Sequence, residues 1–404
     1  MNPTQTHHHP LARFVSENII PAVGAVVLAL IIRSFAIQPF TIPTGSMEPT
    51  LHGDYTRGDK ILADKGALAF SDPERLDVVV FKFPEDVGKK RDFIKRLVGM
   101  PGEAFEIRRG DVYINGDILR KPLHKQKGIW AQVDVADLSK PSLSQPWATS
   151  HDMPSQNGSM LLDGRQQPAS LWYNNLVANS SPSSSRETDL VGDLMAELKL
   201  ALVDAQSGEI TITLQDLGGE VRPLRFSSPR VFGSLRGTSV ASISFDQDGA
   251  TCSIQRNGVE IDSVRTALWS PDEFHSLEFS SYDDTVNLIL DGEVLISEQF
   301  TPSLGAQVLP ASLPPPLGVT ATNCRVALRR IGLHRDVYWT NMAPWGDEGM
   351  VLHIPQAQFV VLGDNSPSSE DSRRWMNSPF VPRENLVARA SVIFWPPQRW
   401  RLIP

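Results

Sequence analysis

The sequence has few cysteines, no zinc-binding pattern and no basic run, and each absence excludes a class of protein. Its 404 residues include two cysteines, Cys252 and Cys324, but no Cys-x-x-Cys pair and no His-Glu-x-x-His motif. The two cysteines form either one disulfide or two buried thiols. The net charge is −8 and no long basic stretch occurs, which argues against nucleic acid as a partner. We expect no metal, no cofactor and no nucleic-acid partner.

Long hydrophobic runs are also scarce, because only one segment reaches the length of a bilayer span. The uninterrupted apolar run, Ile19 to Ile32, is short against the roughly 20 residues that a spanning helix needs. If Arg33 extends its charge to the interface, residues 15–37 are long enough. A cleaved signal peptide with Ser34-Phe35-Ala36 before the cleavage site is the alternative. We predict a short polar tail at residues 1–14 and a retained transmembrane helix at residues 15–37.

The chain from residue 38 to residue 122 has the pattern of short β-strands. The 31 prolines and 28 glycines favour strands and turns over long helices. Residues 75–84 and 93–99 are typical of buried strands, and residues 111–119 predict a hairpin with a type I′ turn at Asn115-Gly116. No crossover helix separates these strands, so we expect an antiparallel sheet.

A second β region begins near residue 123, after a change to Ser-, Pro-, Gln- and Trp-rich sequence. Short strands separated by tight turns predict a β-sandwich. The turns are expected at Asp248-Gly249, Asn257-Gly258 and Asp291-Gly292, and residues 180–185 form an exposed loop. Its tryptophans either line a sugar platform or pack in a core: Trp130, Trp147, Trp172 and Trp269. The expected strands are 194–203, 209–217, 239–245, 251–256, 275–279, 285–290, 294–300 and 325–333.

One serine and one lysine could together carry nucleophilic chemistry. Ser46 lies shortly after the apolar segment, but a serine is a weak nucleophile until a base takes its proton. No Gly-x-Ser-x-Gly elbow surrounds it. A lysine can be the base if burial lowers its pKa from about 10.4. Lys95 lies within the apolar stretch 93–98, where it is either such a base or an ordinary edge-strand charge.

Three segments resemble the conserved boxes of bacterial type I signal peptidases and occur in that family's order. They are Pro43-Thr-Gly-Ser-Met-Glu-Pro-Thr-Leu51, Lys95-Arg-Leu-Val-Gly-Met-Pro-Gly-Glu103 and Gly363-Asp-Asn-Ser-Pro-Ser-Ser-Glu-Asp-Ser-Arg-Arg-Trp375. The resemblance implies a membrane-anchored serine endopeptidase of mainly β fold. Such an enzyme removes signal peptides from exported preproteins with A-x-A-type cleavage sites. It is a single-pass protein of the cell (inner) membrane, in contact with the lipid bilayer, and its catalytic domain lies on the extracytoplasmic side.

The resemblance also implies roles for individual residues. Ser46 is the nucleophile and Lys95 the general base, and the Ser46 N–H and the Thr44 hydroxyl form the oxyanion hole. Ser369 orients the Lys95 amine. Asp371 and Arg373 form a supporting ion pair. Gly363 leaves space beside Lys95, Met47 packs as an apolar cover over the site, and Arg96 is a further supporting residue.

The peptidase-like sequence is interrupted by a large insertion, about residues 123–335. Residues 274–279 and 287–295 resemble concanavalin-like or laminin-G-like sandwiches. We therefore expect a catalytic domain made of residues 38–122 and 336–404, split by a β-sandwich. The insertion binds a glycan or a protein, or it is a spacer or steric shield. In the alternative to an enzyme, the chain is a membrane-anchored binding protein whose sandwich binds the ligand and whose peptidase fold is a scaffold.

Overall fold

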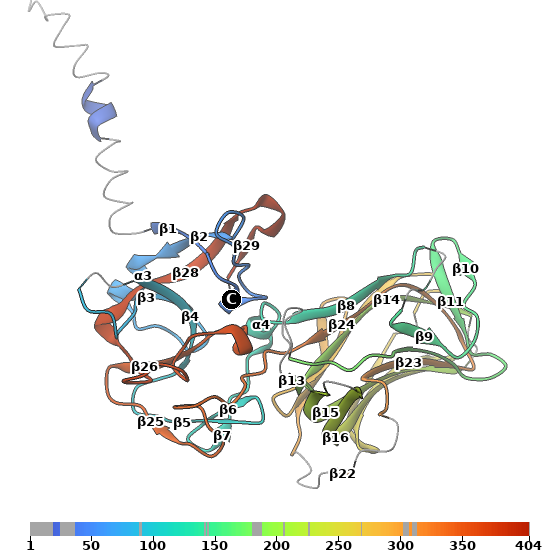
Figure 1. Cartoon of the computed structure of the whole chain (residues 1–404). Coiled ribbons are helices and arrows are strands. Elements are labelled where there is room, and N and C mark those ends of the chain that lie inside the picture. Colours follow the sequence, from blue (N-terminus) through green and yellow to red (C-terminus); the bar gives the residue numbers. More distant parts are fainter. Residues whose placement is uncertain are drawn as a thin grey trace, which may run out of the picture. The chain divides into compact units, whose positions relative to one another are not determined.

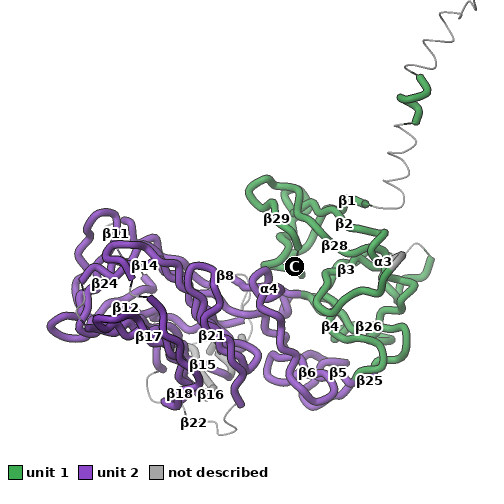
Figure 2. Tube along the Cα trace, turned by 180° about the vertical axis from the view of Figure 1, so that it is seen from behind, with its two compact units in different colours: residues 1–103, 354–363, 369–404 green, residues 104–353, 364–368 purple. Residues whose placement is uncertain are grey.

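The computed structural model describes residues 19–24, 37–88, 91–140, 143, 145–179, 188–204, 207–224, 227–267, 269–301, 307–308 and 313–403 (Figure 1). Every strand pairing among these residues is antiparallel, which confirms the prediction of a mainly β, antiparallel protein. The chain divides into two compact units (Figure 2). Unit 1 comprises residues 1–103, 354–363 and 369–404, and unit 2 comprises residues 104–353 and 364–368.

Unit 1 is built on one sheet whose strands come from both ends of the chain. The order is β1-β2-β28-β3-β4-β26-β27, and β29 pairs with β28. Its strands are β1 (Ile37–Thr41), β2 (Lys60–Asp64), β3 (Val78–Lys82), β4 (Asp92–Gly99), β26 (Gln358–Leu362), β27 (Val381–Pro382), β28 (Leu386–Trp395) and β29 (Arg401–Leu402). The second family-like segment thus begins on β4, β4 pairs with β26, which leads into the third segment, and the first segment lies in the loop between β1 and β2.

Both faces of the central strand β3 are buried, as its run of valines favours. Val79 and Phe81 pack into one apolar cluster, whereas Val78 belongs to a cluster on the other side that contains Met47. A short helix, α3 (Lys65–Phe70), follows β2, and Asp64 caps it by accepting a hydrogen bond from Ala67 N. The site described below therefore lies on a strand system with rigid packing on each side.

Unit 2 contains two large sheets that share one core. The first has the order β10-β11-β24-β14-β19-β20-β21 with β8 beside β24, and the second has the order β18-β17-β16-β15-β23-β12-β9 with β13 and β22 at its margins. Leu198 of β14 and Phe279 of β19 lie in the same apolar cluster as Ile212 of β15 and Ile243 of β16. Side chains of both sheets thus form one interior, which confirms the predicted β-sandwich.

The bounds of the sandwich strands are as follows. The first sheet contains β8 (Ala131–Asp137), β10 (Ser155–Gln156), β11 (Ser159–Asp163), β14 (Leu194–Asp204), β19 (His275–Tyr282), β20 (Thr285–Leu290), β21 (Glu293–Gln299) and β24 (Arg325–Arg335). The second contains β9 (Trp147–Thr149), β12 (Ala169–Tyr173), β13 (Thr188–Leu190), β15 (Gly208–Leu224), β16 (Ser227–Asp246), β17 (Gly249–Arg256), β18 (Val259–Thr266), β22 (Gln307–Val308) and β23 (Leu317–Thr322).

Smaller elements complete the two units. Unit 2 also holds a sheet with the order β25-β5-β6-β7, made of β5 (Ala104–Arg108), β6 (Asp111–Ile114), β7 (Asp117–Ile118) and β25 (Leu352–His353), and the short helix α4 (Leu123–Gln126). Single 3₁₀ turns are η2 (Gly45–Met47), η3 (Ser366–Ser368), η4 (Arg383–Asn385) and η5 (Pro397–Arg399).

Most predicted turns occur where expected. Asn115-Gly116 joins β6 to β7 with positive φ at both residues, and Asn257-Gly258 and Asp291-Gly292 do the same in the sandwich. The prediction for Asp248-Gly249 is wrong by one residue, because Asp246 pairs with Gly249 and the turn falls on residues 247–248. Strands β8 to β12, between residues 131 and 173, were not predicted. In β12 the alternating burial of Ala169, Leu171 and Tyr173 overrides a composition typical of loops.

The cysteines and two of the tryptophans are part of the sandwich interior. Cys252 and Cys324 are buried free thiols, the second of the two alternatives that the sequence left open. Burial raises the pKa of each thiol to about 11, so both stay protonated at neutral pH. Trp147 and Trp269 are buried in the shared core, which makes core packing the correct prediction for these two.

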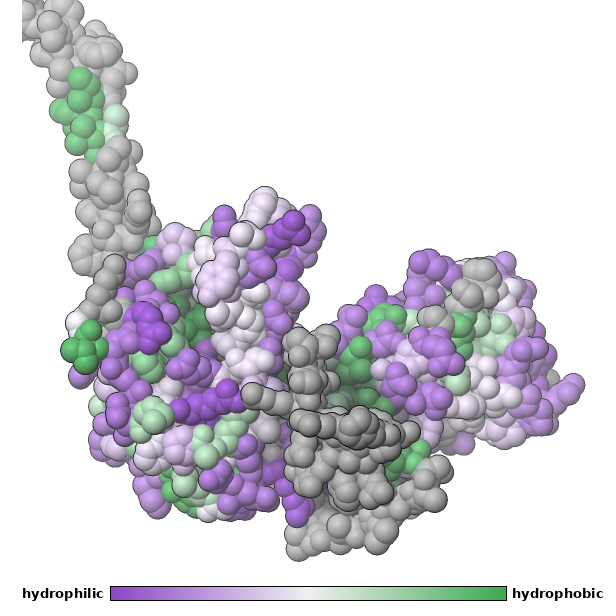
Figure 3. All heavy atoms as spheres, viewed as in Figure 1, coloured by the Kyte–Doolittle hydropathy of each residue, from purple (hydrophilic) through white to green (hydrophobic). Residues whose placement is uncertain are grey.

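The predicted transmembrane helix lies outside the described residues, except for residues 19–24 and residue 37. Residues 19–24 are helical, and Ile19, Ile20 and Val23 are exposed (Figure 3). Within the described part of the chain, no helix is both long and apolar enough to cross a bilayer. The predicted loop at residues 180–185 and the tail at residues 1–14 also lie outside the described residues.

Both ends of the inserted segment are tied to the same buried lysine. The Lys121 Nζ lies 2.6 Å from Asp283 Oδ1 and 2.8 Å from Asp336 Oδ2, and all three side chains are 2% exposed. Lys121 precedes α4, Asp336 follows β24, and Asp283 lies in the turn between β19 and β20. One ammonium group therefore joins the departing chain, the returning chain and a hairpin turn of the sandwich.

We expect Lys121→Met to destabilise the full chain by about 3–5 kcal/mol, because it leaves two carboxylates buried without their cation. Urea unfolding followed by tryptophan fluorescence measures the loss. Lys127→Met is the matched control, because the Lys127 ammonium lies 3.0 Å from Glu278 in an exposed pair and its loss costs at most about 1 kcal/mol. Equal losses in the two variants would contradict the assignment of Lys121 as a buried tie.

Candidate active site

Ser46 lies in a tight turn between β1 and β2. The 3₁₀ turn η2 contains it, and hydrogen bonds from Glu48 N to Gly45 O and from Leu51 N to Met47 O close the loop. The Ser46 side chain is buried, as is that of Met47, which packs in the apolar cluster beneath. Gly53 lets the loop fold back on itself, since a Cβ there would lie 1.8 Å from the Thr44 carbonyl. The backbone around the serine is therefore fixed from both sides.

Lys95 reaches Ser46 from the neighbouring strand β4. Its Nζ donates hydrogen bonds to Ser46 Oγ at 2.7 Å and to Ile94 O at 3.0 Å, and the residue is 3% exposed. The ammonium position also lies 5.7 Å from the centre of the Phe93 ring. The structure thus brings together the two residues predicted as nucleophile and base, although 49 positions separate them in the sequence. Chemically, an amine at this distance can take the hydroxyl proton once it is neutral.

Asp371 and Arg373 form the predicted ion pair, and it is fully buried. Arg373 Nε donates to Asp371 Oδ1 at 2.9 Å and its Nη2 donates to Oδ2 at 2.7 Å. Gly363 N donates to the same carboxylate at 2.9 Å. Burial alone would raise the pKa of Asp371, but the guanidinium and the Gly363 N–H hold it below its usual value. The pair therefore fixes Gly363 at the end of β26.

Gly363 lies directly against the serine loop. An added Cβ would come within 2.1 Å of Ser369 Oγ and 2.5 Å of Ser46 O, so only glycine fits. Ser369 Oγ is buried and close enough to Asp371 to help hold the pKa of that carboxyl low, but it has no well-aligned hydrogen-bond partner among the described residues. The predicted hydrogen bond from Ser369 to the Lys95 amine is not among the contacts of the described residues. Its position beside Gly363 nevertheless places Ser369 next to Ser46, and its orienting role stays a prediction.

Thr44 precedes the turn in an extended conformation, with φ −131° and ψ 150°. Its side chain is exposed and makes no capping hydrogen bond to η2. The hydroxyl is therefore not occupied by the turn, and its part in an oxyanion hole stays a prediction.

Arg96 is buried and contacts the serine loop at Thr50, a residue to which the sequence alone assigns no role. Its Nη1 donates to Leu76 O at 2.7 Å and its Nη2 donates to Thr50 Oγ1 at 3.2 Å. Thr50 is itself 0% exposed. Thr50 belongs to the first family-like segment, which marks it as part of the site. Nothing in the sequence indicates which residues it contacts.

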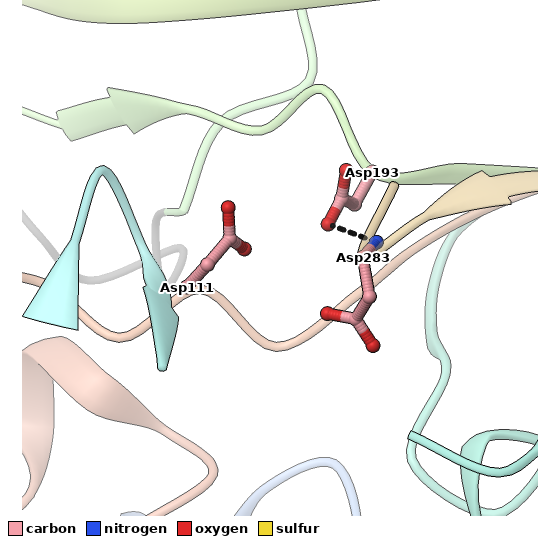
Figure 4. A group of neighbouring side chains, drawn as sticks. All are labelled: Asp111, Asp193 and Asp283. Atoms are coloured by element: carbon pink, nitrogen blue, oxygen red, sulfur yellow. Dashed lines mark hydrogen bonds between the residues drawn. The ribbon is translucent and has the colours of Figure 1, made fainter. Parts of the chain in front are cut away.

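An acidic cluster lies outside this site, in unit 2. Single oxygen atoms of Asp111, Asp193 and Asp283 lie within 4.8 Å of one another, and Asp283 N donates to Asp193 Oδ2 at 3.3 Å (Figure 4). Burial, and then the charge of Asp283, raises the pKa of Asp111 to about 8. Lys121 already pairs with Asp283, so these carboxylates have a cation beside them. We assign no metal to them.

The ion pair predicts an acid dependence of stability. The pKa of Asp371 lies below its usual value of 3.8, so the stabilisation is full above that pH and is lost as the pH falls towards the lower folded-state pKa. We expect Asp371→Asn to unfold more easily at pH 7, where Arg373 is left buried and unpaired, and to show a smaller loss of stability below about pH 4 than the parent chain. Asp72→Asn is the control, because Asp72 is an exposed partner of Arg383. Parallel pH curves for the parent chain and Asp371→Asn, measured by thermal melting, would contradict this origin.

Comparisons with known proteins bear on the same residues. The sequence profile of the family "Signal peptidase, peptidase S26" matches residues 15–170 and 322–395, more than half of the chain. A probable signal peptidase I-1 from Synechocystis sp. is 37% identical over 116 residues, which cover 27% of this chain and 56% of the relative. Signal peptidase I from Pseudomonas aeruginosa is 35% identical over 105 residues, covering 24% and 36%. The chain thus spans about half or less of the length of these relatives.

The internal stretch left unmatched by the family profile, residues 171–321, falls within the predicted insertion. A solved structure from Bacillus subtilis, a protein of unknown function with a galectin-like fold, covers 51% of this chain and 98% of its own chain, at 10% identity and a TM-score of 0.34. A likeness this distant carries no conclusion about the insertion. The matched residues include Ser46 and Lys95, and the two segments together exceed half of the sequence, so the chain belongs to the signal peptidase family, peptidase S26.

Proposed function

We propose that this protein is a serine endopeptidase of the signal peptidase I type, with Ser46 as nucleophile and Lys95 as general base. The observation that carries the proposal is the 2.7 Å hydrogen bond between Lys95 Nζ and Ser46 Oγ, made by two buried side chains. The same bond favours an enzyme over the alternative of a binding protein on a peptidase-like scaffold, because a scaffold has no need of a buried lysine on a serine hydroxyl.

The reaction runs through an acyl-enzyme. Ser46 Oγ attacks the scissile carbonyl carbon while the neutral Lys95 amine takes the hydroxyl proton. The negative charge that develops on the carbonyl oxygen is stabilised by the Ser46 N–H and the Thr44 hydroxyl. The C–N bond then breaks, and the Lys95 ammonium gives its proton to the leaving amine. A water molecule, deprotonated by Lys95, hydrolyses the ester and releases the signal peptide with a free carboxylate.

The substrate docks along the edge of the unit 1 sheet. Strand β1 pairs with β2 on one side and ends the order of the sheet, so its other edge has backbone groups for an added strand. Phe40 is half-buried on this strand, and Ile42, which follows its end, is buried near the serine loop. Apolar surface at these positions suits the small residues of an A-x-A-type site. The substrates are exported preproteins, cut at the outer face of the cell (inner) membrane to which residues 15–37 anchor the enzyme.

The role of the insertion stays a prediction. A glycan or a protein is its expected ligand, with a spacer or steric shield as the alternative. Within unit 2, Lys121 joins the chain before the insertion, the chain after it and a hairpin turn of the sandwich.

We expect Ser46→Ala and Lys95→Met each to abolish cleavage of an exported preprotein while the melting temperature stays near that of the parent chain. The first removes the attacking atom and the second removes the base. Cleavage of a purified preprotein in detergent or lipid vesicles, followed by gel electrophoresis and N-terminal sequencing of the product, measures the effect.

Two variants control for the loss of a lysine or a serine elsewhere in unit 1. Lys82→Met removes a half-exposed lysine on β3 that pairs with Asp92, and Ser391→Ala removes a hydroxyl that bonds to Arg389 O on β28. Both should cleave at the parent rate. Cleavage by either active-site variant at more than a trace would rule out the pair as assigned, and an inactive parent chain with a well-folded sandwich would favour the binding-protein alternative.

The pH dependence of cleavage gives an independent test of the base. Only the neutral amine accepts a proton, so kcat/KM, measured from about pH 6 to pH 9, should rise with pH as the Lys95 ammonium loses its proton. Steady-state kinetics on a fluorogenic peptide with an A-x-A site measures the profile. A profile that is flat over this range, or that falls, is not compatible with Lys95 as the base.

A further inference from the structure

The serine loop is held at one residue, Thr50, by guanidinium groups from two distant parts of unit 1. Arg96 Nη2 donates to Thr50 Oγ1 at 3.2 Å. Arg401 Nη2 donates to Thr50 O at 2.7 Å, and Arg399 Nη2 donates to the same oxygen at 3.4 Å. Thr50 is 0% exposed, so its carbonyl and hydroxyl depend on protein groups for hydrogen bonds.

Arg399 is itself fixed by a buried carboxylate. Its Nε and Nη2 both lie 2.9 Å from Asp59 oxygens, and Asp59 is 1% exposed. Asp59 also accepts a hydrogen bond from His52 N at 2.8 Å, and its own N–H donates to His52 O at 2.9 Å. The carboxylate thus fastens the chain just after Thr50, and a bidentate guanidinium has little freedom to move.

These contacts link the nucleophile to the base through one residue. Thr50 lies within the turn that Leu51 N closes on Met47 O, next to Ser46. Arg96 follows Lys95 directly on β4. The Thr50 hydroxyl is therefore held by Arg96, on the strand that carries the base. The Thr50 carbonyl is held by Arg399 of η5 and Arg401 of β29.

We propose that Arg399 and Arg401 are positioning residues that set the separation of Ser46 Oγ from Lys95 Nζ by holding the Thr50 carbonyl; this rests on the proposed function. Their hydrogen bonds to Thr50 O are the route by which both act on Ser46. Without them the loop shifts, and proton transfer from Ser46 slows, since a displacement of about 1 Å can lower a rate by up to about 100-fold. Substrate binding along β1 is left in place.

The test measures kcat and KM for cleavage of an A-x-A peptide by the full chain carrying Arg399→Ala, Arg401→Ala or Arg399→Lys. Active sites are titrated with an acylating lactam, so that kcat is expressed per reactive serine and a loss of folded protein does not count. We expect kcat to fall by about 10- to 100-fold in the two alanine variants with KM within about twofold of the parent. Arg399→Lys should recover part of the loss, because an ammonium still pairs with Asp59 but cannot bind bidentately and reach Thr50 O.

Arg383→Ala is the matched control. Its guanidinium also binds backbone carbonyls of unit 1, Leu68 O at 2.6 Å and Ser71 O at 3.3 Å, and among the described residues its hydrogen bonds do not reach the serine loop. It should lower the melting temperature without changing kcat per titrated site. The inference is overturned if Arg399→Ala and Arg401→Ala behave as Arg383→Ala does, with parent kcat per site. Activity in Ser46→Ala would instead overturn the proposed function, so the two failures are distinguishable.

Discussion

The structure depends on one constraint: the Lys95 side chain must stay out of water while its amine is hydrogen-bonded to the Ser46 hydroxyl. A buried amine is costly unless its hydrogen bonds are satisfied, and Lys95 meets that need with Ser46 Oγ and the Ile94 carbonyl. Much of unit 1 serves this arrangement. Strand β3 is packed on both faces and keeps β4 in place, and Gly363 allows β26 to approach the serine without a side chain between them.

Two ion pairs of unit 1 support this arrangement. Asp371 binds Arg373 in a fully buried pair, and the buried Asp59 binds the partly exposed Arg399, in each case through the Nε and Nη2 atoms of the guanidinium. Buried pairs add little to net stability but are strongly destabilising when one partner is removed. Their value in unit 1 is geometric, because each fixes a loop that bears on Ser46. The site is therefore rigid on both sides of the reacting atoms.

Local patterns in the sequence predicted most of the later strands of the sandwich, and the family resemblance singled out Ser46 and Lys95, but neither predicted the contacts between distant residues. The apolar run around Lys95 predicts a strand, and Asn257-Gly258 and Asp291-Gly292 predict turns, because each pattern depends only on residues that are close together in the sequence. By contrast, Asp59 and Arg399 are 340 positions apart, and Lys121 and Asp283 are 162 positions apart. No periodicity links such partners, since their meeting depends on the order of strands in the sheet. The short strands β8 to β12 were missed for a related reason. Most of them are strands because they pair with segments that are distant in the sequence, and not because of their own composition.

The pairing of Ala131 with Arg335 places the two ends of the insertion side by side on neighbouring strands, β8 and β24. In topological terms the insertion occupies the position of a hairpin loop: the chain leaves and returns at adjacent points, and whatever lies between them does not alter the path of the flanking segments. A domain attached in this way can be gained, lost or exchanged without a change in the chain path of the domain that carries it. The flanking segments therefore place few limits on the sequence between these two points.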